Sequence, residues 1–145
     1  MLAVLDANVL VSAAISAGPP HRVVQRWLEH GEFDVVACPL LIAEIKSVLL
    51  ERPRMRRWIA ADSARRFLST LGHTAVMMPD PTNFPSVTRD VKDDYLIALA
   101  QAAGADVIVS GDQDLLTWAT QDPPVVTPQQ FEATLARLPR LEDYS

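Results

Sequence analysis

The sequence has few of the residues on which covalent and cofactor sites depend. Cys38 is the only cysteine among 145 residues, so an internal disulfide and a multi-cysteine zinc or iron–sulfur site are both excluded. Glycine is also scarce, with five residues. No Gly-x-Gly-x-x-Gly pattern follows the first apolar run, which argues against a nicotinamide-dependent enzyme.

Long apolar runs are missing as well. No stretch approaches the roughly 18 apolar residues of a transmembrane helix. The first residues lack the basic segment of a secretory signal, and Asp6 would interrupt its apolar core. We therefore expect a cytoplasmic protein that does not contact a membrane. Hydrophobic residues make up 49% of the chain and charged residues 21%, which is typical of a globular protein, and the length predicts a single domain over residues 1–145.

Positive charge is in short supply and unevenly distributed. The chain has 18 acidic and 13 basic residues and a net charge of −5, which argues weakly against a nucleic-acid-binding protein. Six of the basic residues nevertheless lie within residues 52–66. This block could contact phosphates or could form a solvated helix face, and its first members are Arg52, Arg54, Arg56 and Arg57.

Short apolar runs alternate with stretches of helical periodicity along the chain. This alternation predicts an α/β domain with a mostly parallel sheet, and the almost wholly apolar strands indicate a sheet covered on both faces. In such sheets the functional crevice lies beyond the carboxyl ends of the strands. We predict strands at residues 2–5, 33–38, 74–78, 106–110 and 124–126, and helices at residues 8–15, 21–30, 39–51, 55–60, 63–71, 93–104, 111–119 and 127–138.

Carboxylates follow several of these strands or begin the helices that come after them. They are Asp6, Glu44, Asp93, Asp94, Asp112 and Asp114. Taken singly, each has an ordinary explanation, since Asp6 and Asp93 could cap helices and Glu44 could face solvent. Taken together, they place acids from four segments near one edge of the sheet, where unpaired carboxylates raise each other's pKa.

A cluster of carboxylate oxygens without cysteine or grouped histidine is the ligand set that Mg²⁺ or Mn²⁺ prefers. Ions held in this way promote phosphodiester hydrolysis, because one ion can activate a water while another stabilises the leaving oxygen. Arg89 and Lys92 flank the acids at residues 93–94 and could steer a phosphate towards them.

Three stretches of the sequence resemble the PIN domain, the fold of metal-dependent ribonucleases that includes VapC-type toxins of bacterial toxin–antitoxin pairs. They read "VLDANVLVSA", "CPLLIAEIKSVLLERP" and "TRDVKDDYLIALAQAAGADVIVSGDQDLL". The third is the most specific, and it most resembles the branch described as toxin components. The resemblance extends over about residues 2–131 and implies a three-layer α/β/α sandwich with a short, mostly parallel sheet.

The resemblance also implies roles for individual residues. The catalytic acids would be Asp6, Glu44, Asp93 and Asp112, the metal ligands Asp6, Asp93, Asp94, Asp112 and Asp114, and the supporting residues Asn8 and Ser110. Asp93 and Asp94 compete for the position of the third family acid. The implied cofactor is Mg²⁺ or Mn²⁺.

The resulting hypothesis is a metal-dependent endoribonuclease that serves as the toxin of a type II toxin–antitoxin pair. Its expected partners are RNA, a small antitoxin and a second copy of the chain, with RNA contacts from the arginine block, Arg89 and Lys92. One alternative is a non-catalytic RNA-binding or protein-interaction module. An aspartyl-phosphate phosphatase is a weaker alternative, because Asn8 stands where a haloacid-dehalogenase-like phosphatase has its second Asp.

Overall fold

Five short strands form one sheet in the order β3-β2-β1-β4-β5. The computed structural model describes residues 1–138, so residues 139–145 of the predicted domain lie outside the described part. Every pairing between neighbouring strands is parallel, which confirms the predicted α/β class. The strands are β1 (Leu2–Leu5), β2 (Asp34–Ala37), β3 (Val76–Met77), β4 (Val107–Val109) and β5 (Val125–Val126).

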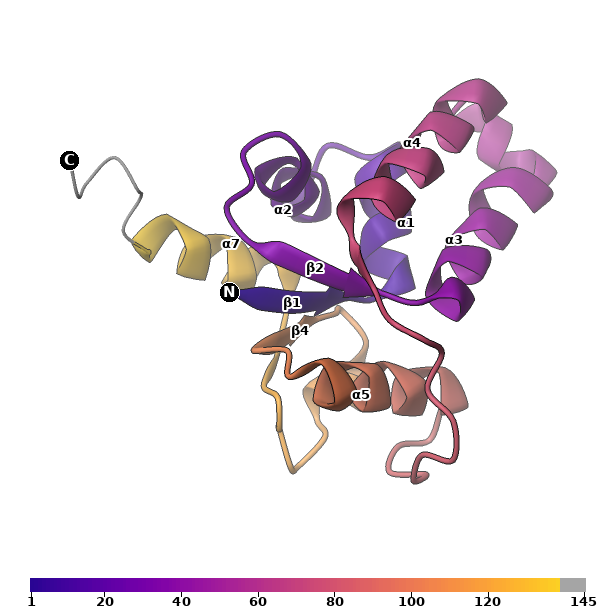
Figure 1. The fold of residues 1–145 in the computed structure, drawn as a ribbon. Coiled ribbons are helices and arrows are strands. Elements are labelled where there is room, and N and C mark those ends of the chain that lie inside the picture. Colours follow the sequence, from indigo (N-terminus) through magenta and orange to yellow (C-terminus); the bar gives the residue numbers. More distant parts are fainter. Residues whose placement is uncertain (139–145) are drawn as a thin grey trace.

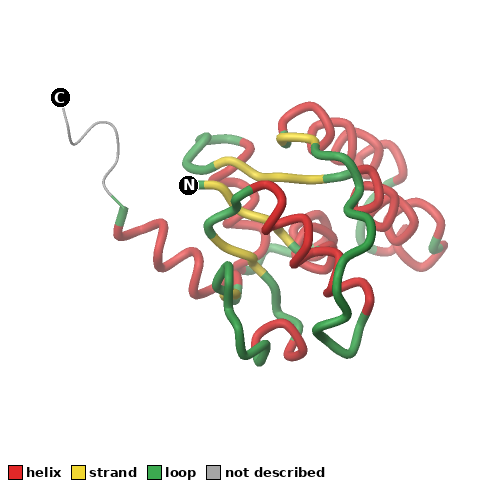
Figure 2. Tube along the Cα trace, turned by 60° about the horizontal axis from the view of Figure 1, so that its bottom comes forward, coloured by secondary structure: helices red, strands yellow, loops and turns green. Residues whose placement is uncertain are grey.

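Helices cover both faces of the sheet, and Figure 2 shows the strands lying between them. Helix α5 packs against β1, β2 and β4 on one face, whereas α1 to α4 lie on the opposite side (Figure 1). No helix in residues 1–138 is both long and apolar enough to cross a membrane. The helices are α1 (Ala7–Ile15), α2 (Pro19–Leu28), α3 (Pro39–Glu51), the 3₁₀ helix η1 (Pro53–Arg57), α4 (Ala61–Thr74), α5 (Val91–Ala103), α6 (Gln113–Leu116) and α7 (Pro128–Arg137).

Local sequence signals set several helix ends. Pro39 occupies the first turn of α3, where its missing N–H costs no hydrogen bond. Gly104 ends α5 with φ of 66°, a left-handed conformation that glycine adopts without strain. The Thr127 side chain and Gln130 form a reciprocal capping box at the start of α7.

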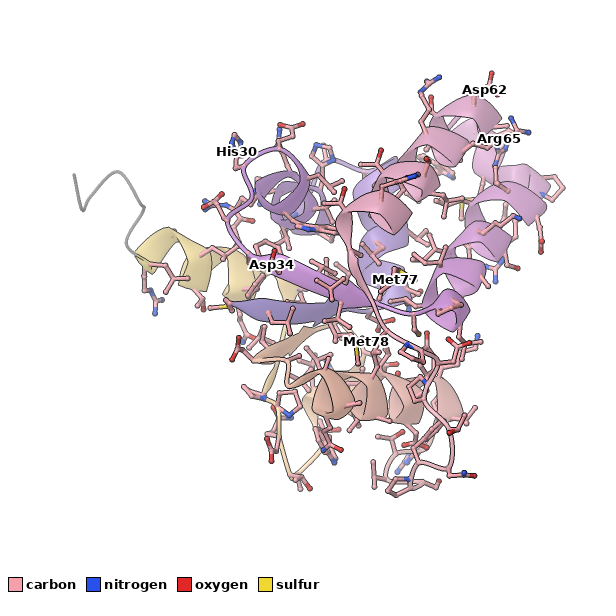
Figure 3. The ribbon with its side chains drawn as sticks, in the orientation of Figure 1. His30, Asp34, Asp62, Arg65, Met77 and Met78 are labelled. Atoms are coloured by element: carbon pink, nitrogen blue, oxygen red, sulfur yellow. The ribbon has the colours of Figure 1, made fainter. Side chains whose placement is uncertain are left out.

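The segment between α3 and β3 differs from the prediction. The helix expected at residues 55–60 is instead η1 (Pro53–Arg57), in which Arg56 donates a hydrogen bond to the carbonyl of Leu49. Helix α4 begins at Ala61, before the predicted start at residue 63, and neither Asp62 nor Ser63 caps it. Asp62 instead lies in the first turn and pairs with Arg65 at 2.6 Å between Oδ1 and the guanidinium (Figure 3).

Strand β3 is shorter than the predicted run at residues 74–78. Its two residues pair only with β2, at the edge of the sheet. Their side chains, Val76 and Met77, are 48% and 44% exposed, and Figure 3 labels Met77 beside β2. The core is therefore built on the buried central strands of the sheet, and the edge at β3 contributes little to it.

Candidate metal centre

Three carboxylates from distant parts of the chain converge at the carboxyl edge of the sheet. Asp6, Asp93 and Asp112 each offer an oxygen, and these atoms lie within 4.8 Å of one another. Asp6 follows β1, and Asp112 comes shortly after β4, the strand paired in parallel with β1. Parallel pairing therefore brings both acids to the same edge, and the first turn of α5 adds Asp93.

Asp6 serves both as a helix cap and as a member of this cluster. Its Oδ1 accepts a hydrogen bond from the Asn8 amide at 3.3 Å, and its Oδ2 accepts one from the Ser110 hydroxyl at 2.7 Å. The Ser110 side chain is fully buried, and its Oγ also accepts the Asp112 amide at 3.0 Å. The predicted supporting residue Ser110 thus links two of the acids, while the Asn8 side chain is exposed.

Asp112 likewise begins a helix, because its Oδ1 accepts a hydrogen bond from the Asp114 amide at 2.9 Å. Asp93 does not cap α5, so that alternative is wrong. The cap is Asp90, whose Oδ1 accepts from the Lys92 amide at 2.9 Å. Sequence analysis missed Asp90, although an Asp two residues before a helix amide is an ordinary capping signal.

Two buried side-chain oxygens within residues 1–138 have no hydrogen-bond partner, and both lie at this edge. They are Oδ2 of Asp93 and the hydroxyl oxygen of Tyr95, on side chains that are each 3% exposed. A buried polar atom without a partner costs roughly 1–3 kcal/mol. The unpartnered Asp93 oxygen, in a cluster with two further acids, indicates a place that is built for a ligand.

The acids also repel one another and are buried away from water. Burial, and then the neighbouring carboxyl group of Asp112 and the charges of Asp6 and Asp90, raise the pKa of Asp93 to about 8. Burial also raises the pKa of Asp6, although hydrogen bonds from Ser110 and Asn8 oppose that shift. A divalent cation would supply the positive charge that these carboxylates lack.

Glu44 and Tyr95 lie near the cluster without belonging to it. Glu44 is half-buried on the second turn of α3, where burial raises its pKa, the Lys92 charge lowers it and the Asp6 charge raises it. The Tyr95 ring packs in the core, and its hydroxyl oxygen is buried without a hydrogen-bond partner. Burial first, and then the charges of Glu44, Cys38, Asp6 and Asp80, raise the pKa of that hydroxyl.

The structure brings Asp93, and not Asp94, into the cluster. One oxygen of Asp94 accepts three hydrogen bonds, from the Thr88 amide and hydroxyl at 2.8 Å each and from the Val87 amide at 3.1 Å. Burial alone would raise the pKa of Asp94, but these bonds hold it below its usual value. Asp94 therefore anchors the preceding loop to α5. Asp114 also lies outside the cluster, and it lines one pocket together with Asp94.

The predicted RNA-binding residues fall into two separate places. Lys92 is in the first turn of α5, directly before Asp93, and Arg89 lines the same pocket as Asp94. Arg52 lies beyond the far end of α3, about 12 Å along the helix from Glu44 at 1.5 Å per residue. The other predicted RNA-binding arginines of the block, Arg54, Arg56 and Arg57, are in η1 and are exposed.

These residues fit a hard divalent cation. Three carboxylates with close oxygens, one of them lacking any other partner, form the all-oxygen donor set of Mg²⁺ or Mn²⁺. Cys38, the only thiol, is buried after β2 and its pKa is raised to about 11, chiefly by burial. A thiolate-preferring metal therefore finds no matching ligand here.

Comparison with known proteins agrees with the fold. The structure is similar to PAE2754 from Pyrobaculum aerophilum, with 20% identity, a TM-score of 0.66 and coverage of 95% of this chain and 91% of that one. It is also similar to the PilT N-terminus domain protein SSO1118 from the hyperthermophilic archaeon Sulfolobus solfataricus P2, with 13% identity, a TM-score of 0.56 and coverage of 97% and 98%. Comparison with curated proteins gives no match. The PIN domain family matches residues 3–114, which include all three clustered acids, and the chain belongs to that family.

Proposed function

We propose that this protein is a metal-dependent endoribonuclease that hydrolyses RNA phosphodiester bonds. The observation that carries the proposal is the convergence of Asp6, Asp93 and Asp112, with an unpartnered buried oxygen on Asp93. Membership of the PIN domain family supports a nuclease. The choice of RNA as substrate rests on the likeness of the sequence motifs to those of PIN ribonucleases.

The chain's own residues have distinct tasks in this proposal. Asp6, Asp93 and Asp112 would hold Mg²⁺ or Mn²⁺. The bound ion would supply Lewis acidity that lowers the pKa of a water and neutralises charge on the phosphate. Ser110 fixes Asp6 through the 2.7 Å hydrogen bond. Glu44, whose pKa is raised by burial, is suited to accept the proton of the attacking water at its carboxylate.

The direct test is cleavage of a labelled RNA with Mn²⁺ or Mg²⁺ and then with excess EDTA. Cleavage is expected only with the metal, because the carboxylates alone supply no electrophile. Ca²⁺ at equal concentration serves as a control for charge screening. Undiminished cleavage in EDTA by the purified protein would contradict the metal-dependent mechanism.

The arginine block is expected to contribute to RNA affinity away from the metal centre. A triple variant, Arg52→Gln, Arg54→Gln and Arg57→Gln, leaves Arg56 to hold the end of α3. If all three contact phosphates, the slope of log affinity against log salt should fall by about 2, at about 0.7 per contact on single strands. Filter binding over a salt series measures the slope, and an unchanged slope would identify the block as a solvated face.

The toxin role, a small antitoxin and a homodimer remain parts of the proposal. They rest on the stretch "TRDVKDDYLIALAQAAGADVIVSGDQDLL" and its likeness to toxin components. A short reading frame beside the gene, encoding a protein with a DNA-binding N-terminal half, would support them. A homodimer would also enlarge the basic surface that a chain of net charge −5 can offer to RNA.

A further inference from the structure

A pocket of about 600 Å³ is lined by Asp94 and Asp114, which lie one and two residues after two of the clustered acids in the sequence. Three segments line it: the loop before α5, one side of α5, and α6 with the residues that follow it. Its volume lies within the roughly 300–1,000 Å³ of small-molecule sites. The pocket is thus large enough for one unit of a nucleic-acid chain.

The pocket and the acid cluster share the first turns of two helices. Asp93 belongs to the cluster, and its neighbour Asp94 lines the pocket. Asp112 belongs to the cluster and caps α6, on which Asp114 lines the pocket. A nucleotide beside a phosphate held at the cluster would therefore lie within reach of the pocket.

The loop wall of the pocket is fixed in place. Asp94 accepts hydrogen bonds from the amides of Val87 and Thr88 and from the Thr88 hydroxyl. The Asp90 carbonyl oxygen also lies 2.8 Å from the Thr88 hydroxyl oxygen, so it and Asp94 share the single proton of that hydroxyl. These bonds tie the loop to the start of α5, so the pocket does not depend on a later ordering of this wall.

The walls combine apolar surface with acceptor groups, among them the carboxylate of Asp114. Val87, Ile97, Ala98 and Trp118 provide apolar contact, which suits the flat face of a nucleobase. Within residues 1–138, no side-chain or backbone donor bonds the Asp114 carboxylate; its amide alone is used, towards Asp112. An ionised carboxylate only accepts hydrogen bonds, so it selects a ligand edge that carries donors.

Guanine matches this edge best among the four bases. Its N1–H and N2–H groups are two adjacent donors that one carboxylate can accept together. Uracil offers a single N–H between two carbonyl oxygens, which a carboxylate repels. Arg89, also on the pocket wall, can contact the phosphate or sugar of the same nucleotide.

We propose that this pocket binds a guanine base of the RNA next to the cleaved bond and that Asp114 reads its Watson–Crick edge. The inference rests on the proposed nuclease function and names a sequence preference for it. It assigns Asp114 to substrate recognition, whereas the sequence resemblance assigned it to the metal.

The first experiment fills the pocket without touching the acids. Ala98→Leu places a larger side chain on the lining face of α5, whereas Ala102→Leu, four residues on, is the control because Ala102 is exposed and does not line the pocket. In the wild type and in the control, cleavage next to guanine should be about tenfold faster than cleavage next to uracil, as one good bidentate base contact allows. Ala98→Leu should lose this preference and keep its thermal stabilisation by Mn²⁺.

A second measurement separates failure of the pocket from failure of the nuclease. Binding of guanosine monophosphate and uridine monophosphate, followed by tryptophan fluorescence in EDTA, needs no cleavage. Guanosine monophosphate should bind the wild type more tightly, and Ala98→Leu should abolish the difference. If neither nucleotide is distinguished, or if Ala98→Leu retains the guanine preference, the proposal is overturned even where RNA is cut. If the wild type cuts no RNA but still prefers guanosine monophosphate, the nuclease function fails and the pocket assignment holds.

Asp114→Asn decides between the two roles of that residue. Its amide replaces one acceptor oxygen with a donor, so the guanine preference should fall about tenfold while the midpoint shift with Mn²⁺ is kept. Loss of the Mn²⁺ shift with an unchanged base preference would return Asp114 to the metal site and overturn the assignment.

Discussion

An Asp93→Asn variant should cut RNA about a hundredfold or more slowly than the wild type in saturating Mn²⁺, with its fold intact. The loss is expected because Asp93 contributes the carboxylate oxygen that has no other partner, and an amide cannot carry the charge that a hard cation requires. Single-turnover cleavage gives the rate, and circular dichroism checks the fold.

Asp94→Asn is the matched control, since it makes the same chemical change one residue along α5. Asp94 accepts three hydrogen bonds from the preceding loop, so its replacement should lower the free energy of unfolding by about 1–3 kcal/mol. The thermal shift produced by Mn²⁺ should persist in Asp94→Asn and shrink in Asp93→Asn. The reverse pattern would make Asp94 the third acid.

The second large effect is a fall in stability with rising pH when metal is absent. The folded-state pKa of Asp93 is about 8, against 3.8 as the ordinary value. Between these values the folded protein holds a proton that the unfolded chain has lost, so the free energy of unfolding decreases as pH rises. One such group gives a slope of up to about 1.4 kcal/mol per pH unit, and Asp6 and Glu44, also raised by burial, add to it.

Urea unfolding in EDTA from pH 5 to pH 8 measures this slope. Asp93→Asn should flatten it, because the variant removes the group that holds the proton. Mn²⁺ should reverse the trend, since it binds the deprotonated acids of the folded form and adds about 2.7 kcal/mol at a hundredfold excess over Kd. A wild type that becomes more stable from pH 5 to pH 8 in EDTA would show that the acids are not close in solution.

The sequence was sufficient to predict the sheet and to name all three clustered acids, with Asp94 as the competitor of Asp93. Asp6 and Asp112 lie just beyond apolar strands, and the carboxyl ends of parallel strands meet at one edge. From the sequence, Asp6 can be either a helix cap or a site residue. The structure shows that one carboxylate does both, because its two oxygens face different partners.

The choice between Asp93 and Asp94 could not be made from the sequence. Consecutive residues on a helix point about 100° apart, so the answer depends on the rotation of α5 about its axis. A polar face normally reveals that rotation, but α5 is buried almost all around its first turns, including Tyr95, Leu96 and Ile97. The rotation is instead fixed by the loop that Asp94 binds, a contact made by residues without any periodic pattern.

The arginine block shows a second limit of sequence analysis. The sequence shows the high density of positive charge in this block. The distance between the block and the acids, however, depends on the direction in which α3 leaves the sheet. The helix expected at residues 55–60 also failed, because Pro53 and the extended Arg52 start a tighter 3₁₀ turn instead. Helical composition alone does not distinguish these two kinds of turn.

The position of β1 in the sheet has a consequence for how the protein is made. This strand lies between β2 and β4, and Asp6 bonds to Ser110, 104 positions later in the chain. A growing polypeptide therefore exposes one side of its central strand until the segment at residues 107–109 has emerged from the ribosome. The acid cluster needs Asp112 as well, so most of the domain must be synthesised before the three carboxylates can meet. A truncated nascent chain therefore has no assembled centre.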